Sequence, residues 1–228
     1  MGASQGNEMT REAVAAGLRR ALGKYYYPRV VWDFSNQREI ILPSMRKVEE
    51  VIRTQLTSRK PSLVKQGLAN VVFWGHRSTG RWKPRLARFL DQVTAAQLEQ
   101  AAQQLPGITG PGLGAIRDLS LPEFSRISFL SKLRMFLDPV RHVVLDLRLA
   151  RLKKATTATL FKGLSVQATC IPCTLSNERV YGCWCSVCDK WGRHLKWPAV
   201  DVERAVFVLA EEDVDAAADT VALMQADS

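Results

Sequence analysis

The stretch Leu121-Pro122-Glu123-Phe124-Ser125-Arg126-Ile127-Ser128 decides how this chain is expected to fold. It places a proline and short polar residues between two segments of helical periodicity, a pattern that predicts a tight turn between helices. The apolar run Val143-Val144-Leu145 follows and ends in Asp146, directly before another periodic segment. Because Asp is a preferred N-cap, the pattern predicts a carboxylate at the start of a third helix.

Most of the remaining sequence has the periodicity of amphipathic helices. The predicted helices cover residues 45–56, 94–104, 113–119, 129–137, 147–153, 175–195 and 200–210. Among the breaks between them, only the segment 162–172 has any strand character. The sequence therefore predicts an all-α, multi-helix fold with at most a small irregular β element near residues 164–172.

The bulk properties favour a polyanionic partner. The chain has 228 residues and a net charge of +10, which favours nucleic acid first and an anionic membrane second. It contains no apolar run of about eighteen residues, so no membrane span is expected. Residues 1–10 are polar and lack the apolar centre of a secretory signal. We therefore expect a cytoplasmic protein.

The turn and the aspartate together resemble the helix-hairpin-helix DNA glycosylase superfamily, which contains endonuclease III and the oxoguanine and alkylpurine glycosylases. The turn has the outline Leu-Pro-x-apolar-x-Arg-x-Ser, and Asp146 follows Ile127 by nineteen residues. The helix at 129–137 contains Ser-Lys-Leu and ends in Phe-Leu-x-Pro, which is similar to a divergent bacterial branch. The resemblance extends over residues 67–210. It implies that the hairpin binds the DNA backbone and that the aspartate drives release of a damaged base.

A second hairpin candidate is Leu105-Pro106-Gly107-Ile108-Thr109-Gly110, which is closer to the glycine-bearing turn of the family. By the resemblance, however, a carboxylate should follow the hairpin at an interval of about nineteen residues. Counting from Pro111 leads to Phe129 or Leu130, which cannot ionise, whereas counting from Ile127 leads to Asp146. The interval therefore selects the turn at 121–128.

The turn at 121–128 lacks the glycines of the family turn. Glu123 and Ser125 replace the two glycines of the family turn. Glu123 is then unfavourable near a phosphate unless it points away or pairs with Arg126. The alternative interpretation of the whole stretch is an ordinary helix-turn-helix corner in the core.

By the resemblance, Asp146 is the catalytic residue, which stabilises the oxocarbenium-like sugar and orients a water. The alternative role for Asp146 is the N-cap, and both roles can hold together. The predicted DNA-binding residues are those of the hairpin and of the segment after the aspartate. They are Ser125, Arg126, Ser128, Lys132 and Arg148.

Some family members use a lysine of the second hairpin helix to form a Schiff base with the sugar. Here the matching position holds Ile127, and Lys132 lies five residues later, more than one turn away and rotated from that face. Lys132 is therefore predicted to contact phosphate. The expected enzyme is a monofunctional hydrolase without a Schiff-base lysine.

A base must leave the helical stack before its glycosidic bond is attacked, and its pocket commonly holds it by aromatic stacking. Aromatic and basic residues alternate in the segment 73–83. The predicted base pocket or wedge is formed by Trp74, His76, Arg77 and Trp82. The alternative is that these aromatic side chains belong to the core.

Four of the five cysteines form a C-x2-C pair, eleven intervening residues and a second C-x2-C pair. Cys170, Cys173, Cys185 and Cys188 thus have the spacing of a structural zinc site. The alternative is buried reduced thiols, because Cys185 and Cys188 share one face of the predicted helix at 175–195. The spacing is not that of the iron–sulfur cluster of endonuclease III relatives, and no organic cofactor is expected.

We expect a single glycosylase-like unit over residues 1–228. Within it, one helical subdomain at 45–155 carries the hairpin and the aspartate. A second, at 1–44 with 156–228, carries the cysteine cluster. The predicted function is excision of a damaged or hypermodified base from double-stranded DNA, in repair or in defence against modified phage DNA, by a monomer with no membrane partner. The alternatives are a non-catalytic helix-hairpin-helix DNA-binding protein and a zinc-bearing interaction module.

Overall fold

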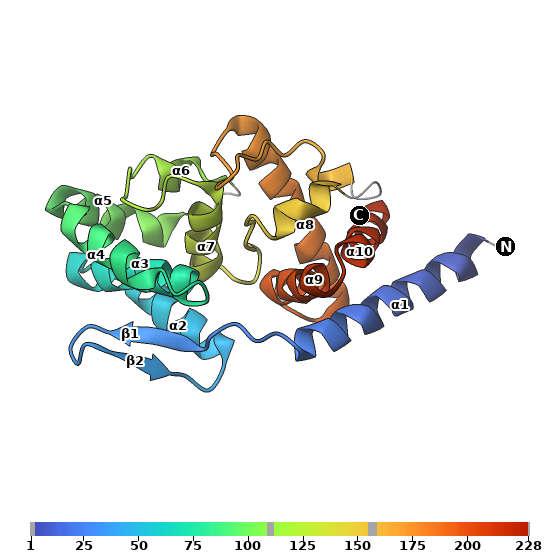
Figure 1. Ribbon diagram of the computed structural model, residues 1–228, viewed down its shortest axis with the longest axis horizontal. Helices are drawn as coiled ribbons and strands as arrows, with labels where there is room; N and C mark the ends of the chain where they lie inside the picture. Colours follow the sequence, from blue (N-terminus) through green and yellow to red (C-terminus); the bar gives the residue numbers. More distant parts are fainter. Residues whose placement is uncertain (1–2, 109–111, 155–158, 228) are drawn as a thin grey trace. The chain divides into compact units, whose positions relative to one another are not determined.

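The computed structural model describes residues 3–108, 112–154 and 159–227. The chain forms two compact units. The central unit comprises residues 27–139, and the terminal unit comprises residues 1–26 with 140–228. Helices dominate both units, and the predicted all-α class is confirmed (Figure 1).

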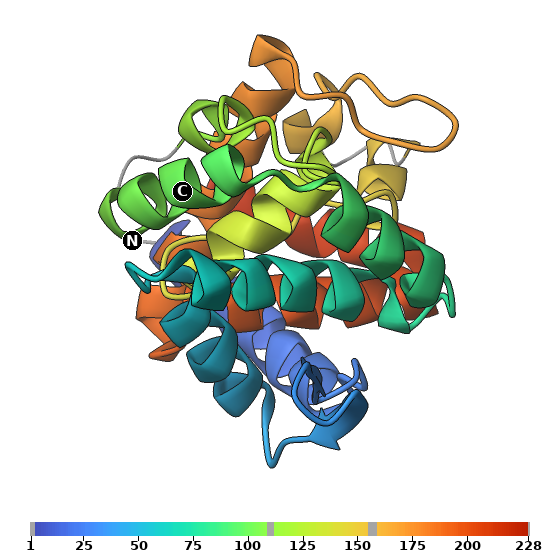
Figure 2. The ribbon, with the colours of Figure 1, turned by 90° about the vertical axis from the view of Figure 1, so that its left-hand side faces the viewer.

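The central unit begins with an antiparallel hairpin of β1 (Val30–Asp33) and β2 (Arg38–Ile41). Its helices follow in the order α2 (Met45–Leu56), α3 (Pro61–Arg77), α4 (Trp82–Gln92), α5 (Ala95–Gln104), α6 (Gly114–Arg117) and α7 (Ile127–Leu137), with a 3-10 turn, η1 (Leu105–Gly107), after α5. Helix α3 packs against α2, α4, α5, α7 and β1. In Figure 2 it runs across the middle of this unit.

The sequence explains where these helices begin and which of them is central. Ser44 caps α2 by accepting from the amide of Lys47, and Thr94 forms a capping box with Gln97 at the start of α5, so each side chain satisfies an amide that a helix end leaves without a partner. Residues 67–74 of α3 are all buried. A helix that is buried all round lies inside its unit.

The terminal unit contains α1 (Ala3–Gly23), the 3-10 segments η2 (Leu149–Lys154) and η3 (Thr159–Phe161), and helices α8 (Leu175–Leu195), α9 (Ala199–Glu212) and α10 (Val214–Ala226). Helix α9 packs against α1, α8 and α10. Gly192 lets the turn after α8 approach closely, because a Cβ there would lie 2.7 Å from the carbonyl oxygen of Trp197. Lys196 closes that turn in the left-handed conformation, with φ 57°.

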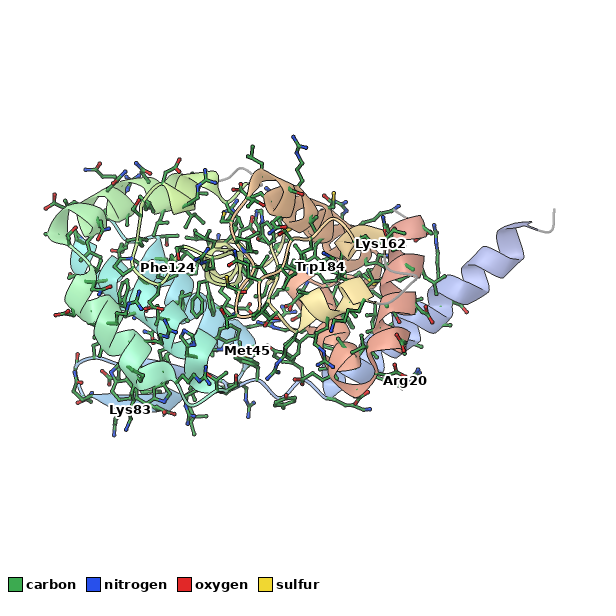
Figure 3. All side chains as sticks on the ribbon, turned by 45° about the horizontal axis from the view of Figure 1, so that its top comes forward. Arg20, Met45, Lys83, Phe124, Lys162 and Trp184 are labelled. Carbon is green, nitrogen blue, oxygen red and sulfur yellow. The ribbon has the colours of Figure 1, made fainter. Side chains whose placement is uncertain are left out.

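Buried tryptophans hold the terminal unit together. The indole of Trp184, labelled in Figure 3, donates to the carbonyl of Val144 at 3.1 Å, and that of Trp191 donates to Met224 at the same distance. Both side chains are almost fully buried. The first bond ties the apolar run before Asp146 to α8.

The β1–β2 hairpin was not predicted. Its turn is stabilised by Asp33, whose Oδ1 accepts from the amides of Ser35 and Asn36 at 2.9 and 3.2 Å. In the region where a β element was expected, the structure has an isolated bridge between Gln167 and Cys170. Two predicted helices also differ in form. The segment expected at 147–153 is the 3-10 element η2, and the one at 113–119 is the single turn α6.

The boundaries of the two units differ from those predicted for the subdomains. The central unit covers residues 27–139, whereas the predicted subdomain covered residues 45–155. The chain leaves the central unit after Pro139, because the following segment packs on helices of the terminal unit. The carbonyl of Val140 accepts from the amide of Ala199 at 2.9 Å. Asp146 is therefore part of the terminal unit, whereas the turn at 121–128 is part of the central unit.

A membrane span would need a long and continuously apolar helix. Within the described parts of the chain, none of the helices has that length and apolarity.

Candidate active site

The predicted hairpin turn is formed by Leu121, Pro122, Glu123 and Phe124. The amide of Phe124 donates to the carbonyl of Leu121 at 3.1 Å, and Glu123 has a φ of 69°. A type II turn requires a positive φ in its third position, and proline is common in its second position. Leu121 and Phe124 are buried, so apolar side chains fix both ends of the turn.

Phe124 places the turn against its neighbouring helices. Its ring meets those of Phe89 and Phe129 edge-on, at centroid distances of 6.1 and 6.2 Å (Phe124 is labelled in Figure 3). Helix α7 begins three residues later, at Ile127, after the extended residue Arg126, which makes no side-chain cap. The amides of such a helix start have no intrahelical acceptor, so they suit an anion.

The glycine-bearing alternative at 105–110 has a different form. Leu105–Gly107 is a 3-10 turn that continues from α5, and the buried Arg134 donates to the carbonyl of Ile108 at 2.8 Å. Thr109 and Gly110 lie outside the described residues.

Glu123 is paired, but not with the residue that the sequence suggested. Its carboxylate oxygens lie 3.3 Å from Nη1 of Arg85 and 3.2 Å from Nε of Arg88, both on α4. The Glu123 side chain is only 5% exposed. The sequence had offered Arg126 as the partner. Arg85 and Arg88 are thus residues of the hairpin region that the sequence analysis missed.

The predicted DNA-binding residues of the hairpin lie at different depths. Ser125 and Arg126 are exposed, and Ser128 is half-buried. Lys132 is 5% exposed, and its Nζ donates to the carbonyl of Ser128 at 3.1 Å and lies 5.3 Å from the centre of the Phe129 ring. The two exposed residues are accessible to a ligand, whereas Lys132 is directed into the protein.

Asp146 is fixed by the backbone that follows it. Its Oδ1 accepts from the amides of Arg148 and Leu149, at 2.9 and 3.3 Å. The preceding residues 143–145 are buried, and Asp146 itself is half-buried. The carboxylate therefore caps η2. The buried residues before it and the amides after it fix its position.

Arg148, also predicted to bind DNA, is held within the terminal unit. Its Nη1 pairs with Glu211, and its guanidinium lies 5.1 Å from the centre of the Phe207 ring. Burial is the largest single influence on Arg148 and opposes its charge, but the contacts with Glu211 and Tyr26 together outweigh burial, so the pKa of Arg148 is raised. Asp146 adds to the same effect. Arg148 thus forms part of the surroundings of Asp146.

The four predicted base-pocket residues do not form one group. Trp74 is a core residue, 3% exposed, whose indole donates to the carbonyl of Pro28 at 3.2 Å. Arg77 pairs with Glu39 of β2 at 3.0 Å. Trp82 packs on Trp32 and Phe73, each at a ring distance of 5.0 Å. These three hold the β hairpin to α3 and α4, so the core interpretation fits them better.

His76 differs from these three, because it faces the hairpin. Its ring stacks on Phe129 of α7 at 4.6 Å, and its Nε2 is buried. Burial, followed by the charges of Arg85, Lys132 and Arg81, lowers the pKa of His76 to about 4. The imidazole is therefore neutral near pH 7 and surrounded by cations.

All five cysteines are free, and the four that were predicted to bind zinc form two pairs along the chain, whereas Cys183 is exposed. The Sγ atoms of Cys170 and Cys173 lie 3.1 and 3.3 Å from the side-chain oxygens of Gln167 and Glu178. Cys185 and Cys188 are buried in α8, and burial raises the pKa of the Cys188 thiol well above its usual value. In the parts of the chain that are described, no three His, Cys, Asp or Glu side chains come together as metal ligands would. The zinc site stays a prediction.

A mostly helical chain with a Leu-Pro turn before α7 and a capping aspartate nineteen residues after Ile127 defines the class of helix-hairpin-helix DNA glycosylases. Comparison with family models agrees. Residues 28–207 match the family described as "Putative 8-oxoguanine DNA glycosylase OGG-like protein". This match spans more than half of the chain, which therefore belongs to that DNA glycosylase family. No curated protein and no solved structure matches the chain.

Proposed function

We propose that the chain is a monofunctional DNA glycosylase that hydrolyses the N-glycosidic bond of a flipped, damaged base and leaves an abasic site. The family description supports an oxidised guanine, 8-oxoguanine, as the first substrate class. From the sequence alone, alkylated and hypermodified bases were equally open. The partner is double-stranded DNA, bound through the hairpin.

The observation that carries this proposal is the fixed carboxylate of Asp146. Two backbone amides hold its Oδ1 in place. An ionised carboxylate beside the sugar stabilises the positive charge that develops as the base departs. It can also orient the water that attacks the sugar carbon. Because the carboxylate is held before the reaction begins, little reorganisation is needed in the transition state.

The monofunctional mechanism is supported by the start of α7. The position that matches the Schiff-base lysine holds Ile127, which is fully buried and has no nucleophile. The nearest lysine on the helix, Lys132, has its ammonium hydrogen-bonded to the carbonyl of Ser128. Water is then the nucleophile, and the product is an intact strand with an abasic site.

A second candidate function is a non-catalytic DNA-binding protein. It is favoured by the same contacts of Asp146, because an N-cap alone accounts for an Asp in that position. Only the glycosylase would produce an abasic site, so detection of this product distinguishes the two functions.

The test is a panel of duplexes, each with one modified base, incubated with the protein and then treated with alkali. We expect cleavage at one class of base, 8-oxoguanine first, and no cleavage without alkali. Asp146→Asn should abolish this cleavage. Asp138→Asn, at the C-cap of α7, is the matched control and should remain active. Binding without cleavage of any duplex would establish the non-catalytic alternative instead.

A further inference from the structure

Glu123 occupies a position at which glycine would be the less strained residue. Its φ of 69° lies in the left-handed region, which costs an L-residue roughly 1–2 kcal/mol and glycine almost nothing. The side chain must therefore contribute something that a glycine could not. Among the described residues, its carboxylate pairs with two arginines of α4, at 3.3 and 3.2 Å.

The ion pairs of Glu123 are asymmetric. The carboxylate side chain is 5% exposed, whereas the side chains of Arg85 and Arg88 are 44% and 55% exposed. The acid is thus enclosed, and each guanidinium keeps a large solvent-facing surface. Nε of Arg88 donates to Oε1 of Gln92 at 3.3 Å, so the contact of Arg88 with Glu123 is an ion pair without a hydrogen bond. One enclosed anion thus lies between two exposed cations and accepts a hydrogen bond from Arg85.

The charges of this region do not cancel. Besides Arg85 and Arg88, Arg81 at the N-cap of α4 and the buried Lys132 of α7 contribute cations, and the carboxylate of Glu123 faces them. The effect of Arg85, Lys132 and Arg81 on the pKa of His76 independently indicates that their positive potentials overlap beside the hairpin. A surface with excess positive charge and oriented guanidiniums favours phosphate groups.

We propose that Arg85 and Arg88 of α4 bind the DNA phosphate backbone beside the hairpin, and that Glu123 is the positioning residue that orients both guanidiniums. The inference rests on the proposed function in one respect, namely that duplex DNA is the partner. Arginine suits this role because its five N–H donors can bind a carboxylate on one side and a phosphate on another. Glu123 itself does not touch the DNA.

The competing explanation is that the ion pairs only stabilise the strained turn. The two explanations predict opposite signs for Glu123→Gly. Glycine keeps the turn in its preferred conformation and removes one negative charge. If the turn alone matters, the variant should bind DNA at least as tightly as the original chain. If Glu123 positions the arginines, binding should weaken although the net charge has become more positive.

The experiment measures affinity for an unmodified duplex by fluorescence anisotropy over a series of salt concentrations. The variants are Arg85→Gln, Arg88→Gln and Glu123→Gly. Arg53→Gln on α2 is the matched arginine control, and Glu99→Gln on α5 is the matched acid control. Each α4 variant should lower the salt dependence of log K by about 0.9, the contribution of one phosphate contact. Arg53→Gln should leave the slope unchanged.

Glu123→Gly should weaken binding and lower the slope, with its thermal midpoint unchanged or raised, whereas Glu99→Gln should bind equally or more tightly. Unchanged slopes in both arginine variants would overturn the α4 contact. Equal or tighter binding by Glu123→Gly would overturn the positioning role. Neither result affects base release, which is tested separately on modified duplexes. If the original chain binds duplex DNA without releasing any base, the proposed function fails while this inference stands, and if it binds no duplex both fail.

Discussion

His76 should make the stability of the protein depend on pH, with a predictable sign. Its pKa is about 4 in the folded chain, against 6.5 for the ordinary imidazole, because burial and the neighbouring cations oppose its charge. The folded state therefore binds fewer protons than the unfolded state between these two values. The free energy of unfolding is highest above pH 6.5 and falls as the pH decreases towards 4.

The size of this effect follows from the same shift. A difference of about 2.5 pKa units corresponds to roughly 3.4 kcal/mol at 1.36 kcal/mol per unit. The imidazole is only partly buried, and solvent screening reduces such energies. We therefore expect a loss of about 1–2 kcal/mol between pH 7.5 and pH 4.5 from His76 alone.

The assay is urea unfolding of the original chain and of His76→Phe at pH 7.5 and 4.5. Phenylalanine keeps a ring to stack on Phe129 and cannot be protonated. The stability of the original chain relative to His76→Phe should fall by about 1–2 kcal/mol on acidification. His194 is an exposed residue of α8, and His194→Gln is the control. This variant should lose the same amount of stability on acidification as the original chain. If the original chain and His76→Phe respond to pH in parallel, the account of His76 is wrong.

Three further predictions concern the hairpin helix and the cysteines. Borohydride during turnover should trap no protein–DNA adduct, and trapping that disappears in Lys132→Ala would show that Lys132 acts as a nucleophile. Gly75→Ala should destabilise the chain by roughly 1–2 kcal/mol in thermal unfolding, since overpacking outweighs the gain in helix propensity. The added Cβ would lie 2.7 Å from Phe129, and an unchanged midpoint would mean that α3 and α7 are less tightly packed. Elemental analysis should find about one zinc per chain, lost in Cys170→Ser with Cys173→Ser, and a chelator should lower thermal stability. Full stability in chelator with no zinc would favour the reduced thiols.

Local patterns in the sequence were sufficient to predict several elements of the fold. The helices at 45–56 and 175–195 have the predicted bounds, because apolar periodicity and a Ser or Thr cap define both. The β1–β2 hairpin was missed because its strands are only four residues long. So short a segment shows little periodicity, and its pairing depends on contacts with α3.

The site was predictable only where its parts are close in sequence. The turn at 121–124 and the cap at Asp146 depend on neighbouring residues, and the structure has both. The pairing of Glu123 with Arg85 joins residues 38 positions apart, which no local pattern indicates. Trp74 and Trp82 were assigned to a pocket because alternating aromatic and basic residues occur both on a DNA-binding face and in a core helix. Only burial separates the two.

In the proposed reaction, Asp146 supplies the charge that stabilises the sugar as the glycosidic bond breaks. The most direct test of this role is single-turnover release of free 8-oxoguanine from a duplex, measured by mass spectrometry for the original chain and for Asp146→Asn. Asparagine also caps helices, so folding and duplex affinity, measured in parallel, should be retained. The account predicts release by the original chain and a rate reduced on the order of 10²- to 10³-fold in Asp146→Asn. Equal rates for the two proteins would contradict it.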